Sequence, residues 1–171
     1  IWQSGEFRSE RVPGFNFLND GKHYTKNDGG QINKYDLTTG KKVSTIFDAA
    51  TVEDEAFGGK FGSYAFSDDE SQIILKTASE QIYRRSSKAN FFIWDIASSS
   101  IKAVRGDAKQ MYATLSPDGK KIAYVIANNL YIQEVGTGKE TQITNDGKQN
   151  QVINGSADWV YEEEFSMAKA F

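Results

Sequence analysis

Three consecutive glutamates, Glu162, Glu163 and Glu164, end the stretch DWVYEEE at residues 158–164. In a helical turn, successive side chains point about 100° apart, so two carboxylates can flank one point while the third faces elsewhere. Two carboxylates held close together repel each other, and a cation between them relieves that repulsion. The run is therefore a candidate receptor for an ammonium or guanidinium group, with a solvated acidic surface as the alternative interpretation.

A second charged stretch, IYRRSSK at residues 82–88, places Arg84 beside Arg85 among aromatic and polar residues. If the fold brings the two stretches together, they form either an ion-pair latch or a site for a ligand with a positive end and hydrogen-bond acceptors. An exposed arginine loop with a single ion pair is the simpler alternative. Trp94 and Trp159 are expected in the core, between sheets.

Composition excludes several other kinds of site. The chain has no cysteine and a single histidine, His23, which rules out thiolate chemistry and two-histidine metal motifs. The net charge of −3 lacks the basic excess of a nucleic-acid-binding protein. No apolar run approaches the roughly 18 residues of a membrane span, and no signal-like segment is present. NGSAD (154–158) is not a nucleophile elbow, and we expect no catalytic residue in this chain. We also expect no metal and no cofactor.

An internal repeat supplies the elements that must position these residues. Segments of the form aromatic-or-Leu, turn and strand begin at Phe17, Phe66 and Leu115, which are spaced by 49 residues. Each is followed by a second hairpin with alternating apolar and polar positions. Four short antiparallel strands in roughly 40–50 residues are typical of a propeller blade. The sequence predicts an all-β fold, a partial β-propeller of about three four-stranded antiparallel blades.

Both charged stretches fall where the repeat is interrupted. The second repeat carries an insertion of ten residues between its two hairpins, around residues 79–88, and about seven extra residues lie around 154–165 in the third. Functional sites in repeat proteins concentrate at such departures. A short helical or irregular segment is expected near 158–166.

The expected organisation is a piece of a larger propeller, because propellers close with at least four blades. Such a fragment is expected to self-associate through its open blade edges. The expected boundaries are blade-like repeats at about 7–50, 57–105 and 108–150, an inter-blade glutamate segment at 154–167, and the start of the next blade at 168–171.

Two segments resemble one family. DWVYEEEF (158–165) resembles the signature glutamate segment in the propeller of the dipeptidyl peptidase IV family, serine exopeptidases of the prolyl oligopeptidase clan. IYRRSSKANFFIWDI (82–96) resembles the family's segment in which an arginine precedes an aromatic–Asp pair by eleven residues. Counting back from Asp95 assigns Arg84 to the arginine position.

The resemblance implies a parent peptidase that releases N-terminal Xaa-Pro or Xaa-Ala dipeptides. It implies an eight-bladed propeller over an α/β-hydrolase domain that holds the Ser-Asp-His triad and is absent from this chain. By position, Glu163 and Glu164 would grip the free α-ammonium group of the substrate, and Glu162 would stand outside this pair. Arg84 would contact the substrate carbonyl and position the glutamates, although the adjacent Arg85 leaves a choice. This segment would anchor substrate and gate access, and would be inactive alone.

The expected partners are peptide substrates with a free N-terminus, the missing hydrolase domain of the same parent chain, and a second copy in a homodimer. The resemblance places the parent in the periplasm, in secretions or at the cell surface. The alternative is a non-enzymatic β-propeller interaction module. A downstream G-W-S-Y-G-G-type nucleophile elbow would distinguish the two.

Overall fold

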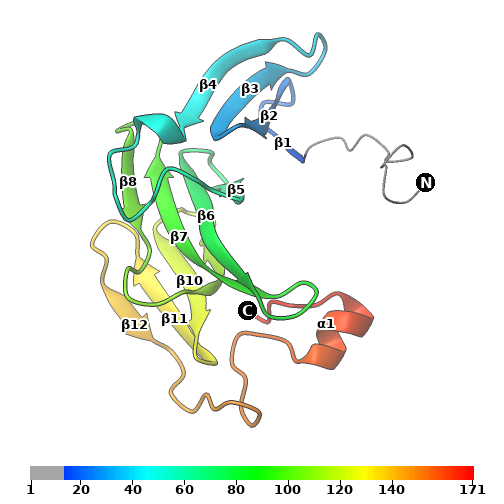
Figure 1. The fold of residues 1–171 in the computed structure, drawn as a ribbon, viewed down its shortest axis with the longest axis vertical. Helices are drawn as coiled ribbons and strands as arrows, with labels where there is room; N and C mark the ends of the chain where they lie inside the picture. Colours follow the sequence, from blue (N-terminus) through cyan, green and yellow to red (C-terminus); the bar gives the residue numbers. More distant parts are fainter. Residues whose placement is uncertain (1–13) are drawn as a thin grey trace, which may run out of the picture. The chain divides into compact units, whose positions relative to one another are not determined.

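The computed structural model describes residues 14–171 and divides into two compact units, Ile1–Asp48 and Ala49–Phe171. Within the described residues, twelve strands form three four-stranded antiparallel sheets, and the only α-helix is short (Figure 1). The predicted fold class, all-β with about three four-stranded blades and a short helical segment near 158–166, is confirmed. No helix in the described part of the chain is long and apolar enough to cross a membrane.

The first unit contains one sheet in which the strands follow one another in chain order. They are β1 (Phe15–Phe17), β2 (His23–Asp28), β3 (Gln31–Asp36) and β4 (Lys42–Asp48). Ile32 and Phe47 are cross-strand partners and are fully buried, so they form the apolar face of this blade. The expected first repeat begins at residue 7, and its residues 7–13 lie outside the described part.

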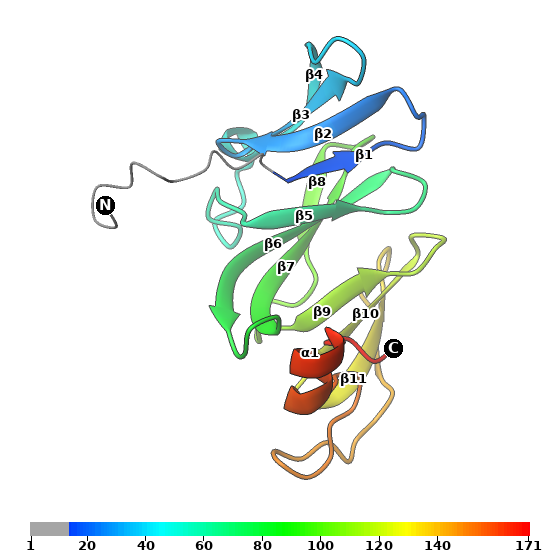
Figure 2. The same cartoon turned by 90° about the vertical axis from the view of Figure 1, so that its right-hand side faces the viewer.

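The second unit holds the other two sheets, again in chain order. The second sheet consists of β5 (Ser63–Phe66), β6 (Gln72–Gln81), β7 (Ser87–Asp95) and β8 (Ser100–Ala103). The third sheet consists of β9 (Met111–Leu115), β10 (Lys121–Ile126), β11 (Asn129–Glu134) and β12 (Glu140–Gln142). A 3-10 turn, η1 (Ala49–Thr51), precedes them, and the helix α1 (Trp159–Phe165) follows them (Figure 2).

The second and third sheets share one apolar core. Phe91 and Ile93 of β7 pack into the same buried cluster as Ile122 and Tyr124 of β10. Strand alternation turns the intervening residues to the opposite face of β7, where Phe92 meets Phe57 with ring centroids 5.4 Å apart. The neighbouring cluster members are Ile74, Ala89 and Val104. Trp94 is also buried, as expected from the sequence.

The 49-residue period corresponds to one structural position. Phe17, Phe66 and Leu115 are the last residues of β1, β5 and β9, the first strand of each sheet. The turn after that strand requires a left-handed residue in each repeat. Gly21 and Gly119 supply it with φ of 63° and 66°, whereas Glu70 adopts the same conformation with φ of 58°. Because a side chain disfavours this conformation, the second turn carries strain that the other two avoid.

We therefore expect Glu70→Gly to stabilise the protein by about 0.5 kcal/mol, since relief of the strained φ exceeds the entropy that glycine costs in the unfolded chain. The matched control is Gly119→Ala, which introduces the same strain in the third repeat and is expected to destabilise by about 1 kcal/mol. Denaturant midpoints of the two variants measure both effects. Shifts of the same sign would contradict this account of the turns.

Candidate functional site

The ten extra residues of the second repeat form an extension of the β6–β7 hairpin. The two strands pair beyond a bulge between Thr77 and Glu80, where Ala78 has a φ of 45°. The tip is closed by a hydrogen bond of 2.9 Å from the Ile82 amide to the Ser86 carbonyl. A bulge bends a strand and redirects the residues beyond it. The insertion thus lengthens a hairpin and carries the arginine pair at its tip.

Ion pairs tie the stem of this hairpin to the third sheet. The Glu80 carboxylate pairs with Lys88 of β7 at 3.0 Å and with Lys109 of the segment before β9 at 2.5 Å. Hydrogen bonds from Lys109 and then Lys88 lower the pKa of Glu80 below its usual value. The carboxylate therefore stays ionised at neutral pH and links two neighbouring sheets.

The glutamate run lies on α1, a two-turn helix whose ends are held together. The Asp158 side chain caps the helix by accepting a hydrogen bond of 3.0 Å from the Tyr161 amide. At the base, the Ala157 amide donates to the Ala168 carbonyl at 3.0 Å, and Ala170 donates to Gly155 at 3.1 Å. The helix therefore belongs to a loop that follows the third sheet and whose two ends are hydrogen-bonded to each other. Figures 1 and 2 both show it beside the tip of the β6–β7 hairpin.

Glu162 is the buried member of the run, with 1% of its surface exposed. Its Oε1 atom accepts hydrogen bonds from the backbone amides of Arg85 at 2.6 Å and Ser86 at 2.9 Å. Burial acts to raise the pKa of this carboxyl, but the amides of Arg85 and Ser86 and the Ser86 side chain outweigh it and hold the pKa below its usual value. Hydrogen bonds to a charged acceptor contribute about 1.5–3 kcal/mol each. Glu162 thus fastens the hairpin tip to the helix.

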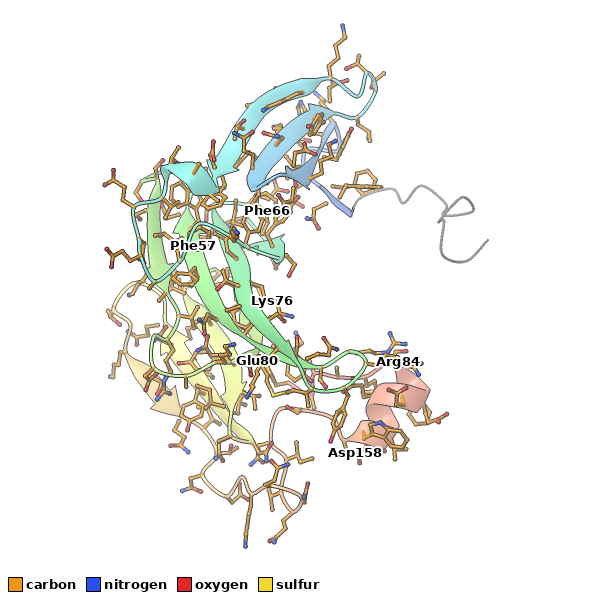
Figure 3. All side chains as sticks on the ribbon, in the orientation of Figure 1. Phe57, Phe66, Lys76, Glu80, Arg84 and Asp158 are labelled. Carbon is orange, nitrogen blue, oxygen red and sulfur yellow. The ribbon has the colours of Figure 1, made fainter. Side chains whose placement is uncertain are left out.

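Glu163 meets the other charged stretch directly. Its Oε2 atom lies 3.2 Å from Nε of Arg84, whose side chain is 73% exposed while that of Glu163 is 16% exposed. Arg84 projects from the hairpin tip toward α1 in Figure 3. Such an exposed ion pair contributes at most about 1 kcal/mol. Of the two candidate arginines, Arg84 supplies the side chain and Arg85 a backbone amide.

Glu164 is exposed on α1, one residue beyond the ion pair. The three carboxylates therefore occupy three settings, namely buried under the hairpin, paired with an arginine and open to solvent. The expectation that Trp159 lies in the core is wrong, since 56% of this side chain is exposed. A two-turn helix offers its inward direction to few residues, and Glu162 occupies it. Tyr161 and Phe165 are exposed beside it, with ring centroids 5.5 Å apart.

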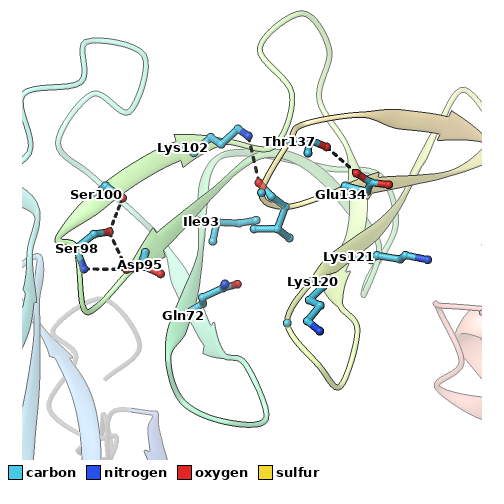
Figure 4. A pocket seen from close by; sticks show the side chains of 13 residues that line it. Gln72, Ile93, Asp95, Ser98, Ser100, Lys102, Lys120, Lys121, Glu134 and Thr137 are labelled. Carbon is cyan, nitrogen blue, oxygen red and sulfur yellow. Dashed lines mark hydrogen bonds between the residues drawn. The ribbon is translucent and has the colours of Figure 1, made fainter.

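A separate cavity of the second unit lies away from the arginine tip and α1. It has a volume of about 710 Å³ and is lined by Lys102, Lys120 and Lys121 together with Asp95 and Glu134 (Figure 4). These residues sit at the turn end of the sheets, near the start of β6, whereas the arginine tip lies beyond the end of β6. Ten strand residues separate the two ends by roughly 33 Å. Among residues 14–171, no three acidic or histidine side chains gather to hold a metal ion.

Comparison with known proteins identifies the family and the fold. A family profile described as "Dipeptidyl peptidase IV (DPP IV) N-terminal region" matches residues 67–171, which include the hairpin tip and α1. The chain belongs to the dipeptidyl peptidase IV family. The crystal structure of Porphyromonas gingivalis dipeptidyl peptidase 4 matches 98% of this chain with a TM-score of 0.88 and 34% sequence identity. The chain is therefore a partial β-propeller of the kind found in that family.

Two further relatives match most of this chain. Dipeptidyl peptidase 4 of Trichophyton rubrum is 33% identical over 159 residues, which are 92% of this chain and 19% of the relative. Human prolyl endopeptidase FAP is 28% identical over 157 residues, which are 90% of this chain and 20% of that protein. The chain also covers 24% of the Porphyromonas gingivalis structure. It thus spans about a fifth to a quarter of the length of these relatives.

Proposed function

We propose that this segment anchors the free N-terminus of peptide substrates in a dipeptidyl peptidase IV-type serine exopeptidase. The observation that carries the proposal is the ion pair between Arg84 and Glu163, with the exposed Glu164 as the next residue of α1. Arg84 comes from the β6–β7 hairpin, and the two glutamates come from α1, nearly eighty residues later. Such an arrangement matches a ligand that carries an ammonium group next to a carbonyl oxygen.

The chemistry of the ligand can be derived from the donors and acceptors. A terminal ammonium has three N–H donors, and carboxylates on adjacent helix residues, about 100° apart, can accept from it on two sides. The guanidinium of Arg84 has five N–H donors and uses Nε for Glu163, so the same group can bridge Glu163 and a substrate carbonyl. An N-acylated peptide has no ammonium, so it would offer no cation to Glu164 and would leave Glu163 with Arg84 alone.

The anchor also accounts for release of dipeptides. We place the Ser-Asp-His triad in an α/β-hydrolase domain of the parent chain, outside this segment. If the anchor holds the first residue of the peptide, only a bond at a fixed distance from the N-terminus reaches the nucleophile. The segment then gates substrate by length, contributes no catalytic residue and is inactive alone. A periplasmic, secreted or cell-surface location belongs to the same proposal.

The test compares two substrates in the full-length parent protein. Xaa-Pro coupled to a chromophore should be hydrolysed, and the N-acetylated form should show kcat/KM lower by on the order of 100-fold, since a charge pair loses one partner. The matched control is a substrate with an N-methylated terminus, which keeps the positive charge. Equal turnover of the acetylated and free peptides would overturn the proposal.

A non-enzymatic interaction module is the second candidate, and the exposed aromatic side chains of Trp159, Tyr161 and Phe165 favour it. The coding sequence downstream decides between them. A nucleophile elbow of the G-W-S-Y-G-G type supports the peptidase, and a complete gene without one supports the module.

A further inference from the structure

Glu162 is the member of the acidic run that the anchoring chemistry leaves unused. It lies beneath the hairpin tip with 1% of its surface exposed, and Arg85 and Ser86 donate their amides to its Oε1 atom. Burying a carboxylate is costly unless its hydrogen bonds compensate. The buried Glu162 carboxylate therefore depends on the two amides of the hairpin tip. In the same way, these hydrogen bonds hold the hairpin tip on α1.

Arg84 has few other restraints. Its side chain is 73% exposed, and its ion pair with Glu163 is of the solvent-screened kind that rarely fixes a long side chain. The hairpin tip is closed across its width by Ile82 and Ser86, but that bond does not set the tip's direction toward α1. Glu80 holds the stem of the hairpin, and the contacts that fix the tip itself on α1 come from Glu162 to the two residues immediately after Arg84.

The surroundings of Glu162 support this assignment from a third element. Tyr112 of β9 adopts a left-handed φ of 58°, which is strained for a large side chain, next to the register shift between β9 and β10. Burial first, and then the charge of Glu162, raise the pKa of the Tyr112 hydroxyl. Tyr112, Ser86 and Glu162 also line one cavity of about 450 Å³. The buried carboxylate thus lies between the second sheet, the third sheet and α1.

We propose that Glu162 is a positioning residue that aims Arg84 at Glu163 by fixing the β6–β7 hairpin tip on α1. The inference rests on the proposed anchoring function. In this arrangement Glu162 never touches substrate. It acts through the backbone of the residues after Arg84, so removing its side chain lowers activity only in a protein that still has Arg84.

The experiment is a double-mutant cycle in the full-length parent protein with a free Xaa-Pro substrate. Glu162→Ala is expected to lower kcat/KM by about 10- to 50-fold, mainly through KM, and Arg84→Ala by at least as much. The double variant is expected to match Arg84→Ala alone, because Glu162 acts through that residue. Glu162→Gln keeps an oxygen that accepts both amides and should stay within about threefold of wild type.

Two further variants keep the test decisive. Glu162→Asp retains the charge but is one methylene shorter, so it covers the case in which Glu162→Ala fails to fold, and it should lose activity as the alanine variant does. Glu134→Ala, an exposed glutamate of β11 at the far cavity, is the matched control and should leave activity unchanged. Hydrogen exchange should show faster exchange at the Arg85 and Ser86 amides in Glu162→Asp.

The outcomes separate the two proposals. Wild-type activity of Arg84→Ala and of Glu163→Gln together would refute the anchoring function itself. Loss of activity in Arg84→Ala with wild-type activity in Glu162→Asp would refute only the positioning role. Losses that add in the Glu162 and Arg84 double variant would also refute it, because Glu162 would then act on another part of the site.

Discussion

Replacing Glu163 with glutamine is expected to lower kcat/KM for a free N-terminal Xaa-Pro substrate by on the order of 100-fold or more in the full-length parent protein. Truncating one partner of a desolvated charge pair costs about 2–5 kcal/mol, and each 1.36 kcal/mol is tenfold. The exposed Arg84 side chain leaves its pair with Glu163 screened by solvent, but Glu163 itself is only 16% exposed, and a bound ammonium group would cover it further. Glutamine keeps the shape and an acceptor for Arg84, which confines the change to charge. Glu164→Gln is expected to act in the same direction with a smaller loss, since Glu164 is exposed.

The controls for this prediction are built into the chain. Glu134→Gln removes the same charge at the opposite end of the sheets and should leave kcat/KM within about twofold. Circular dichroism should show that both site variants keep the β-sheet signal. Turnover close to wild type in Glu163→Gln and Glu164→Gln would mean that the carboxylates do not bind the substrate ammonium.

Replacing Tyr124 with alanine is expected to destabilise the propeller by about 3–5 kcal/mol, the cost of removing a large buried ring. Tyr124 is fully buried in the core shared by the second and third sheets, and its hydroxyl donates to Glu140. Arg105 Nη1 lies 3.0 Å from both carboxylate oxygens of Glu140, so the hydroxyl belongs to a paired charge network. The measurement is the free energy of unfolding in guanidinium chloride.

Tyr124→Phe separates the ring from the hydroxyl. It keeps the packing and leaves Glu140 with Arg105, so the expected cost is about 1 kcal/mol. Ile143→Ala, at a half-exposed position after β12, should change stability by no more than about 0.5 kcal/mol. A Tyr124→Ala loss no larger than that of Ile143→Ala would show that the two sheets do not share a core.

The repeat could be predicted from the sequence because each blade repeats the same short pattern of strand end and turn. Phe17, Phe66 and Leu115 end the first strand of their sheets, and the turn after each needs a left-handed residue. The family resemblance assigns Arg84 rather than Arg85 to the arginine position, and Arg84 is the arginine whose side chain pairs with Glu163. Local patterns of this kind are readable without knowing the fold.

The role of Glu162 was not readable in the same way. Its partners are backbone amides, which every residue except proline carries, so no side-chain pattern at positions 85 and 86 points to a buried carboxylate. Because the burial of Glu162 could not be foreseen, the expectation that Trp159 lies in the core was wrong. Hydrophobicity places a tryptophan in the core, but the burial of Glu162 turned the aromatic residues of α1 outward. A charged residue took the inward position because backbone donors of the hairpin tip face it there.

The hydrogen bonds between Glu162 and the hairpin tip join residues 76 and 77 positions apart in the chain. On a ribosome that adds about 5–20 residues per second, the hairpin emerges roughly 4–15 s before the helix that fixes it. During that interval the second sheet can form from local contacts, whereas its arginine tip has nothing to dock on. The assembled anchor is thus a late event in the biogenesis of this segment, and it reports that the third sheet has already formed.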